Sequence, residues 1–283
     1  METVTSIPGL RRQLAAVRAR GKRIALVPTM GNLHAGHLEL VRQARRQAEH
    51  VVVSIFVNPA QFGPQEDYDN YPHTPERDRD ALLETGADLL FLPEVEEIYP
   101  QGPGDTTVVE VPGLNRILEG AHRPTHFNGV TTVVAKLFNL VQPDVAVFGE
   151  KDYQQLLLIR RMVADLCMPV TIVGVATVRE MDGLAMSSRN GYLDPVERAL
   201  APRLHAVLAE VKARVEAGGQ DLAAIEQDAL AQLAAAGFQP DYVDVRRCSD
   251  LTPPAPGDTD LIALAAARLG PARLIDNIFI SIS

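Results

Sequence analysis

The chain has 283 residues, of which 46% are apolar, and a formal net charge of −9. That length and apolar content are enough for one large core or two smaller ones. The acidic balance argues against nucleic acid or an anionic membrane surface as the main partner, so an anionic ligand has to be held by a local group of cations. The only two cysteines, Cys167 and Cys248, fit neither a disulfide framework nor a zinc-binding spacing.

The N-terminal residues METVTSIPGLRRQL lack the apolar segment and the small-residue cleavage site of a signal peptide. The longest apolar runs, such as VVVSIFV at 51–57, are too short to cross a bilayer. We therefore predict a soluble, cytoplasmic protein that has no membrane partner.

Helix and strand patterns alternate over the first 175 residues. Apolar periodicity predicts helices at 9–21, 35–49, 75–85, 127–141 and 152–166, and strands at 23–28, 50–57, 87–93, 144–149 and 169–175. Strands separated by helical crossovers predict an α/β fold with a doubly wound, Rossmann-like parallel sheet. We expect strands 23–28 and 144–149 to be neighbours where the strand order reverses, which is where such sheets bind ligands.

The pattern changes after about residue 178. A polar, glycine-bearing segment at 179–195 precedes two predicted helices, 195–217 and 221–236, and three predicted antiparallel strands. The expected organisation is a nucleotide-binding and catalytic domain over residues 1–177 and a smaller C-terminal α/β lid domain over residues 178–283.

The segment PTMGNLHAGH, residues 28–37, joins a strand to a helix through a glycine turn. The amides and dipole of a helix N-terminus favour an anion, and Gly31 lets a phosphate approach the backbone closely. His34 and His37 are one helical turn apart, so both imidazoles can donate to one phosphate or carry a proton. A capping or packing role is the alternative for either histidine alone; zinc is disfavoured because no further ligand completes the set.

Two other segments offer groups for a phosphate. In FGEKDYQQ, residues 148–155, Lys151 can act as a point charge, and Gln154 or Gln155 can read an uncharged polar group. In MSSRN, residues 186–190, two serine hydroxyls and Arg189 suit a triphosphate, on a loop able to close over a site. A solvated lysine with surface glutamines, and an ordinary interdomain linker, are the respective alternatives.

Weaker candidates lie elsewhere. Asn58 and Gln61 follow a strand at the same edge of the sheet, and Arg123 and His126 lie near a helix start where they can meet an anion. Asp78 is a candidate for reaching magnesium together with Glu76 and Asp80, although a solvated helix face is the simpler interpretation of these acids.

PTMGNLHAGH resembles the HIGH-type signature of the nucleotidyltransferase superfamily, and MSSRN resembles its KMSKS-type loop. With NPAQF, HRPTHF, FGEKDYQQ and REMDGLAMSSRN in this order, nearly the whole chain resembles the pantothenate synthetase (pantoate–beta-alanine ligase) family. One departure is Thr125 in HRPTHF, where the family more often has glycine, and it concerns the local turn.

The resemblance implies an ATP-dependent ligase. Pantoate attacks the α-phosphorus of ATP, magnesium pyrophosphate leaves, and beta-alanine converts the bound pantoyl adenylate to pantothenate and AMP. It also implies a homodimer whose other partners are these small molecules, with no nucleic acid.

The resemblance further assigns His37 as the catalytic acid, and the charge that develops in the first step calls for His34, Lys151 and Arg189 beside it. The expected ATP-binding residues are Met30, Gly31, Asn32, Leu33, His34, Ala35, Gly36, His37, Gly149, Glu150, Lys151, Asp152, Val178, Met186, Ser187, Ser188 and Arg189. The expected pantoate-binding residues are Gln61, Gln155, Asn58, Arg123 and His126, and Gln61 is also expected to bind beta-alanine.

Two other functions remain open from the sequence. One is a nucleotidyltransferase of the same superfamily that joins a phosphorylated substrate to a nucleotide. The other is a catalytically silent nucleotide-binding regulator. The two glutamines and the second domain favour the ligase over the first, and the intact histidine pair disfavours the second.

Overall fold

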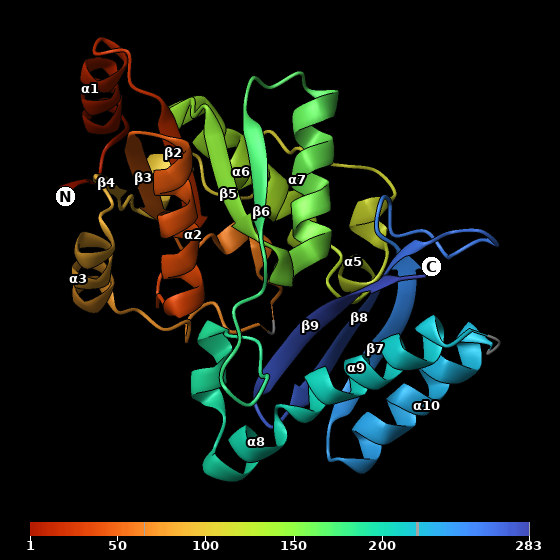
Figure 1. Cartoon of the computed structure of the whole chain (residues 1–283). Coiled ribbons are helices and arrows are strands. Elements are labelled where there is room, and N and C mark those ends of the chain that lie inside the picture. The colour runs from red at the N-terminus through yellow and green to blue at the C-terminus, as the bar shows by residue number, and fades with distance from the viewer. Residues whose placement is uncertain (65, 219–220, 283) are drawn as a thin grey trace. The chain divides into compact units, whose positions relative to one another are not determined.

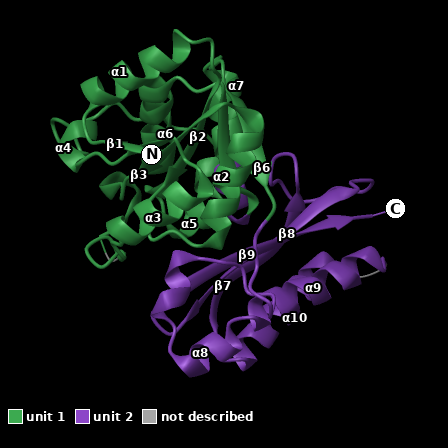
Figure 2. Cartoon of the chain, turned by 60° about the vertical axis from the view of Figure 1, so that its left-hand side comes forward, with its two compact units in different colours: residues 1–150, 158–176 green, residues 151–157, 177–283 purple. Residues whose placement is uncertain are grey.

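The computed structural model describes residues 1–64, 66–218 and 221–282. The chain divides into two compact units, which Figure 2 colours separately. The larger unit comprises residues 1–150 and 158–176, and the smaller unit comprises residues 151–157 and 177–283. The division expected from the sequence, at 177/178, places residues 151–157 in the first domain, whereas the compact units place them in the second.

The larger unit is built on a six-stranded parallel sheet. In spatial order its strands are β1 (Glu2–Val4), β4 (Leu89–Phe91), β3 (His50–Ile55), β2 (Ile24–Thr29), β5 (Val145–Gly149) and β6 (Thr171–Val175). This confirms the predicted doubly wound α/β fold. Strand β1 was not predicted, because three residues paired only with β4 at a sheet edge leave too short a pattern to detect.

The order of the strands reverses between β2 and β5. From β2 the chain adds β3 and β4 on one side, and it later adds β5 and β6 on the other. Ala25 of β2 pairs with Val145 of β5, so the two predicted strands are neighbours as expected. The loops at their carboxyl ends are the ones that carry PTMGN and GEKD.

Helices lie on both faces of this sheet (Figure 1). Helix α2 (Ala35–Gln47) packs on β2, β3 and β5, while α6 (His126–Val141) packs against β2 and α1 (Ile7–Arg18). Helix α3 (Pro75–Thr85) contacts α2 and ends at Gly86, which has φ 88°. Helix α7 (Tyr153–Asp165) follows β5, and the short helices α4 (Val95–Ile98) and α5 (Glu119–His122) lie between β4 and α6.

The smaller unit pairs helices with an antiparallel sheet of β7 (Gln239–Arg247), β8 (Asp260–Leu269) and β9 (Ala272–Ser281). Helix α9 (Arg203–Glu216) packs on β8 and β9, and α10 (Leu222–Ala235) packs on α9 and β7. The helix predicted at 195–217 is instead two helices, because Pro202 has no N–H to continue α8 (Pro195–Leu200) into α9. Within the described residues, no helix is both long and apolar enough to span a membrane.

Candidate active site

The loop between β2 and α2 is held by a carboxylate from another helix. Asp78 of α3 accepts the backbone amides of Asn32 and Leu33, each at 2.8 Å, and the hydroxyl of Thr74 at 3.0 Å. These two loop amides therefore donate to the protein itself, and fewer backbone groups are offered to an anion than the motif predicts. The Asp78 side chain does not belong to a solvated helix face, because the residue is only 1% exposed.

Gly31 is required by packing as well as by backbone conformation. Its φ is +83°, and a Cβ there would lie 3.0 Å from Cγ2 of Ile55 and 3.2 Å from Oδ2 of Asp78. The next residue, Asn32, has φ 49°, a left-handed conformation that asparagine tolerates better than most residues. The loop therefore turns sharply over the end of β3, and this packing is a reason for the glycine that the sequence did not indicate.

The two histidines cap helix α2. His34 is the N-cap residue, and its Nδ1 accepts the amide of Gly36 at 3.2 Å. His37 returns the bond, because its Nδ1 accepts the amide of His34 at 3.3 Å. The ring centroids are 4.0 Å apart, which confirms that the two imidazoles lie side by side. With each Nδ1 acting as an acceptor, a neutral ring carries its proton on Nε2.

The capping role and the ligand role are therefore compatible. Capping uses the Nδ1 edge of each ring, which faces the start of the helix, whereas proton transfer or phosphate binding would use Nε2–H. Of the remaining residues in the motif, Leu33 is 4% exposed and its side chain belongs to the core around β2 and β3, whereas Ala35 is exposed.

Gln61 lies in a buried turn after β3, in the short helix η1 (Pro59–Gln61). Asn58 caps this turn: its Nδ2 donates to Oε1 of Gln61 and to the carbonyl of Gly129, both at 3.1 Å. Its Oδ1 accepts the hydroxyl of Tyr99 at 2.8 Å. Nε2 of the Gln61 side chain then donates to Sδ of Met30 at 3.0 Å. Asn58 thus forms hydrogen bonds within the protein and orients Gln61, and its direct contact with pantoate stays a prediction.

Arg123 and His126 lie beside the same turn. Arg123 forms an ion pair with Glu66, with Nη2 and Oε2 2.5 Å apart, so its charge is already matched. Nδ1 of His126 lies 2.9 Å from the carbonyl oxygen of Gln61. Burial, aided by the positive charge of Arg123, lowers the pKa of His126 to about 4. His126 is therefore neutral near pH 7 and does not supply the positive charge for an anion that its sequence position indicated.

Strand β5 ends at Gly149, and Glu150–Asp152 form one turn of 3₁₀ helix before α7. Gln154 is 3% exposed, whereas Gln155 is only partly buried, so Gln155 is the more accessible glutamine of the pair. In the smaller unit, Nδ2 of Asn277 donates to the carbonyl of Lys151 at 2.8 Å and fixes the backbone of the lysine. Nζ of Lys151 is 3.9 Å from Asp152, a distance too long for a strong ion pair.

The segment that carries MSSRN, residues 178–190, is called the flap segment below. The amide of Met186 donates to the carbonyl of Val178 at 3.0 Å, which brings the two ends of its first turn together. Oγ of Ser187 accepts the amide of Arg189 at 3.3 Å and caps the 3₁₀ helix η4 (Ser188–Tyr192). These hydrogen bonds fix the backbone conformation at Ser187 and Arg189.

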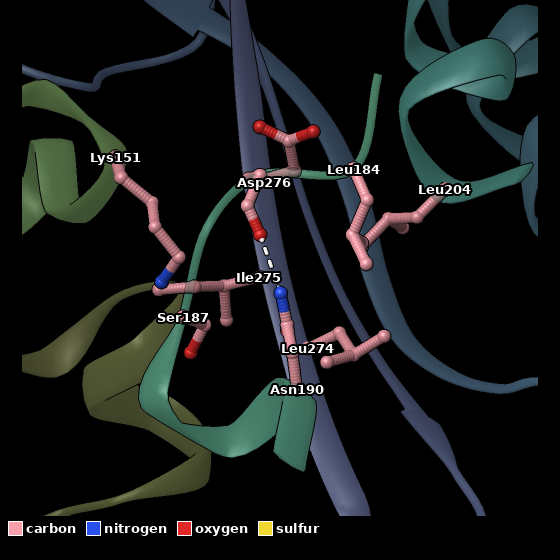
Figure 3. A pocket seen from close by; sticks show the side chains of 9 residues that line it. Lys151, Leu184, Ser187, Asn190, Leu204, Leu274, Ile275 and Asp276 are labelled. Atoms are coloured by element: carbon pink, nitrogen blue, oxygen red, sulfur yellow. Dashed lines mark hydrogen bonds between the residues drawn. The ribbon is translucent and has the colours of Figure 1, made fainter. Parts of the chain in front are cut away.

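A small pocket of the smaller unit brings the lysine and the flap segment together (Figure 3). Nδ2 of Asn190 donates to the carbonyl of Ala185 at 3.0 Å, and its Oδ1 is buried without a partner among the described residues. The pocket thus offers a cation, a hydroxyl and an acceptor. Its lining residues are Lys151, Leu184, Ala185, Ser187, Asn190, Leu204, Leu274, Ile275 and Asp276.

The fold and these segments define an α/β enzyme with a Rossmann-like sheet and a HIGH-type histidine motif at the helix that follows its central strand. The chain belongs to the pantoate–beta-alanine ligase family, whose model matches residues 2–279. It is accordingly a ligase that joins pantoate to beta-alanine and forms pantothenate.

Relatives and solved structures match over nearly the full length. The pantothenate synthetase of Thioalkalivibrio sulfidiphilus is 58% identical over 98% of this chain and 97% of the relative. The crystal structure of pantothenate synthetase from Thermus thermophilus is 50% identical, covers 98% and 99% of the two chains, and superposes with a TM-score of 0.91. The pantoate–beta-alanine ligase of Francisella tularensis, complexed with beta-gamma ATP and beta-alanine, is 32% identical, covers 98% and 97%, and has a TM-score of 0.81.

Proposed function

We propose that this enzyme activates pantoate with ATP. A carboxylate oxygen of pantoate attacks the α-phosphorus, the bond to pyrophosphate breaks, and pantoyl adenylate remains bound. The amine of beta-alanine then attacks the acyl carbon and loses a proton, and AMP leaves with the electrons of the C–O bond. The ATP and beta-alanine complex of the Francisella tularensis ligase supports both substrates here.

The observation that carries this proposal is the reciprocal cap at the start of α2. The Nδ1 atoms of His34 and His37 are used by backbone amides, so a neutral ring presents an Nε2–H in a fixed direction. Such donors stabilise the negative charge that develops when pyrophosphate leaves. We assign His37 as the acid in this step and His34 as a second donor to the phosphates.

The remaining cations and donors are assigned to the triphosphate. Lys151, Ser187, Ser188 and Arg189 supply positive charge and hydroxyls, and the remaining ATP contacts fall to residues 30–36, 149, 150, 152, 178 and 186. Gln61 and Gln155 read the hydroxyl groups of pantoate, because neutral amides bind a hydroxy acid without holding its carboxylate back from attack. Gln61 also binds beta-alanine. Asn58 orients the side chain of Gln61, while Arg123 and His126 lie at its backbone carbonyl.

Magnesium is proposed to enter with ATP and to neutralise the departing pyrophosphate. Asp78 does not fit as its ligand, since both of its carboxylate oxygens accept hydrogen bonds from the protein and the residue is buried. Among the described residues, no cluster of three or more histidine, cysteine, aspartate or glutamate side chains is arranged to hold a metal.

The second domain is proposed to act as a lid that excludes water from the adenylate. By the pattern of the family, we also propose a cytoplasmic homodimer. Size-exclusion chromatography with light scattering tests the dimer: a mass near 62 kDa is expected from the 30.8 kDa chain, and a mass near 31 kDa contradicts it.

The decisive experiment is ATP–pyrophosphate exchange. We expect exchange to require pantoate and Mg²⁺, and AMP release to be accelerated by beta-alanine. Exchange without pantoate would instead indicate a nucleotidyltransferase with another acceptor. Absence of exchange with pantoate or with any other acid would favour the catalytically silent nucleotide-binding regulator.

A further inference from the structure

The first part of the flap segment is a tight two-stranded turn. Arg179 and Ala185 form an isolated antiparallel bridge, and the amide of Glu180 donates to the carbonyl of Leu184 at 2.8 Å. Gly183 closes the turn, because its amide donates to the carbonyl of Glu180 at 3.0 Å. Ser187 follows this turn after a single residue, so the position of the turn sets the position of Ser187 and Arg189.

The turn is fastened to β9 through one arginine. Nη1 and Nη2 of Arg179 donate to the two carboxylate oxygens of Asp276 at 2.7 and 2.9 Å. The same guanidinium also donates to the carbonyl of Gly183 at 3.1 Å and to that of Asn277 at 3.2 Å. Arg179 therefore joins both arms of the turn to two consecutive residues of the strand, in the planar fork geometry that lysine does not reproduce.

Asp276 is the buried side of this contact. Its side chain is 2% exposed, against 21% for Arg179, and Nδ1 of His205 on α9 lies 3.4 Å from its Oδ2. Its Oδ1 also accepts the amide of Asn277 at 2.8 Å. A carboxylate with several hydrogen-bond partners has little freedom to move. The turn, which is bound to it through Arg179, is therefore held in a fixed position on the sheet.

Asn277, the residue after Asp276, fixes the backbone of Lys151 on the other side of the pocket. Nδ2 of Asn277 donates to the carbonyl of Lys151, and Asn277 is itself 4% exposed. Two adjacent residues of β9 thus hold the flap segment and the lysine. We propose that Asp276 is a positioning residue, which through Arg179 sets the flap segment in register with Lys151 for the triphosphate; this inference rests on the proposed role of the flap segment in binding ATP.

A second ion pair of the same strand provides the control. Nε of Arg273 on β9 is 2.7 Å from Oδ2 of Asp241 on β7, with side-chain exposures of 14% and 24%. This pair also joins an arginine to an aspartate in the smaller unit, but Arg273 and Asp241 are not flap residues and do not line the pocket. Asp276→Asn and Asp241→Asn therefore compare the loss of one carboxylate with and without a link to the flap segment.

The test measures two quantities in each variant. Steady-state kinetics should show that Asp276→Asn raises KM for ATP about tenfold or more while KM for pantoate changes less than about twofold, because a small misplacement of binding groups is costly. Hydrogen exchange without substrates should show faster exchange in residues 178–190. Asp241→Asn should change neither quantity beyond about twofold.

Equal rises in both KM values, or unchanged exchange in the flap segment, would overturn the proposal. If Asp276→Asn does not fold, Arg179→Lys replaces it, with Arg273→Lys as its control and the same two readouts. Hydrogen exchange does not require enzyme activity. It therefore tests whether Asp276 anchors the flap segment even if the wild-type enzyme shows no ATP–pyrophosphate exchange. In that case the proposed role of Asp276 in ATP binding is rejected, whereas the exchange data still show whether Asp276 anchors the flap segment.

Discussion

The carboxylate of Asp78 accepts the amide of Leu33 at 2.8 Å, although the two residues are 45 positions apart. The same carboxylate accepts the amide of Asn32, so α3 holds the loop that leads into the histidine-capped helix. An acidic residue thus stabilises a loop proposed to bind a triphosphate, and it does so through hydrogen bonds to the backbone.

Asp78→Asn is expected to destabilise the fold by about 1–3 kcal/mol, because an amide cannot accept on both atoms and leaves a buried N–H unpaired. Activity should fall with it, since the loop sets the direction of α2. Asp80→Asn is the control, because Asp80 lies on the same helix and is exposed. Urea unfolding and turnover measure the two effects; equal stability in both variants would show that the loop does not need the carboxylate.

His37→Asn is expected to separate the cap from the chemistry. The side-chain oxygen of asparagine can replace Nδ1 as the acceptor for the amide of His34, so stability should change little. The Nε2–H is lost, and the rate of adenylation should fall about 10²- to 10⁴-fold, as for the loss of a general acid. Rapid-quench kinetics and ATP binding by calorimetry check this; a loss of ATP affinity that matches the loss of rate would leave His37 only a binding role.

Asn58→Ala should raise KM for pantoate, because Gln61 loses the donor that orients its side chain. It should also cost about 1–3 kcal/mol of stability, since the carbonyl of Gly129 and the hydroxyl of Tyr99 lose their partner inside the core. Tyr99→Phe is the control, as it removes one bond to Asn58 but keeps the bond from Asn58 to Gln61. If both variants raise KM equally, the orientation of Gln61 does not depend on Asn58.

Gly129→Ala is expected to be among the most damaging substitutions. A Cβ there would lie 2.2 Å from the carbonyl oxygen of Ala60, a backbone atom that cannot move aside without displacing η1. In most helices the same change is stabilising by up to about 1 kcal/mol, so a loss of several kcal/mol would reverse the usual sign. Gly104→Ala, where a Cβ has nothing within 4 Å, should be nearly neutral in thermal unfolding. Similar melting temperatures would contradict the close approach of α6 to η1.

The low pKa of His126 predicts a pH-dependent loss of stability. Its folded pKa of about 4 lies below the ordinary value of 6.5, so the unfolded chain binds the proton more readily. The free energy of unfolding is therefore nearly independent of His126 well above pH 6.5, and it falls by up to about 2 kcal/mol as the pH decreases from 7.5 to 5. Arg123 acts in the same direction as burial, while the carbonyl of Gln61 and the carboxylates of Glu119 and Glu66 oppose it.

The measurement compares wild type with His126→Gln in urea at both pH values. The variant should lose less stability on acidification, because glutamine does not titrate. His50, whose pKa is also lowered by burial, is present in both proteins and cancels in the difference. Parallel losses in the two proteins would show that His126 is not buried in its neutral form.

Local periodicity was sufficient to predict the central part of the fold. The alternation of helices and strands predicted the parallel sheet, the adjacency of β2 and β5, and the antiparallel strands of the smaller unit. Likewise, the spacing of His34 and His37 predicted that their rings share one face of a helix. The elements and the ring pair depend on neighbours within a few residues, which a single sequence displays directly. The adjacency of β2 and β5 follows instead from the general rule that doubly wound sheets bind ligands where the strand order reverses.

The supports of the site could not be found in this way. Asp78 and Leu33 are 45 positions apart, and Asn277 and Lys151 are 126 positions apart. The sequence around an aspartate in a polar helix looks the same whether the side chain is solvated or buried. The sequence therefore favours a solvated Asp78, although the residue is buried. Its burial depends on the distant loop before α2, whose amides it accepts. Glu66 matches the charge of Arg123, and burial keeps His126 neutral; neither effect is visible in HRPTHF.

The assignment of residues 151–157 to the smaller unit has a practical consequence for dissecting the enzyme. The ring of Tyr153 packs edge-on against Phe279 with centroids 5.3 Å apart, and its hydroxyl donates to the carbonyl of Cys248 at 3.0 Å. A C-terminal fragment starting at residue 178 would lack the ring that packs on Phe279 and would leave the carbonyl of Cys248 without this hydrogen bond. Chimaeras that combine domains from two relatives should therefore take residues 151–157 and the C-terminal segment from the same parent.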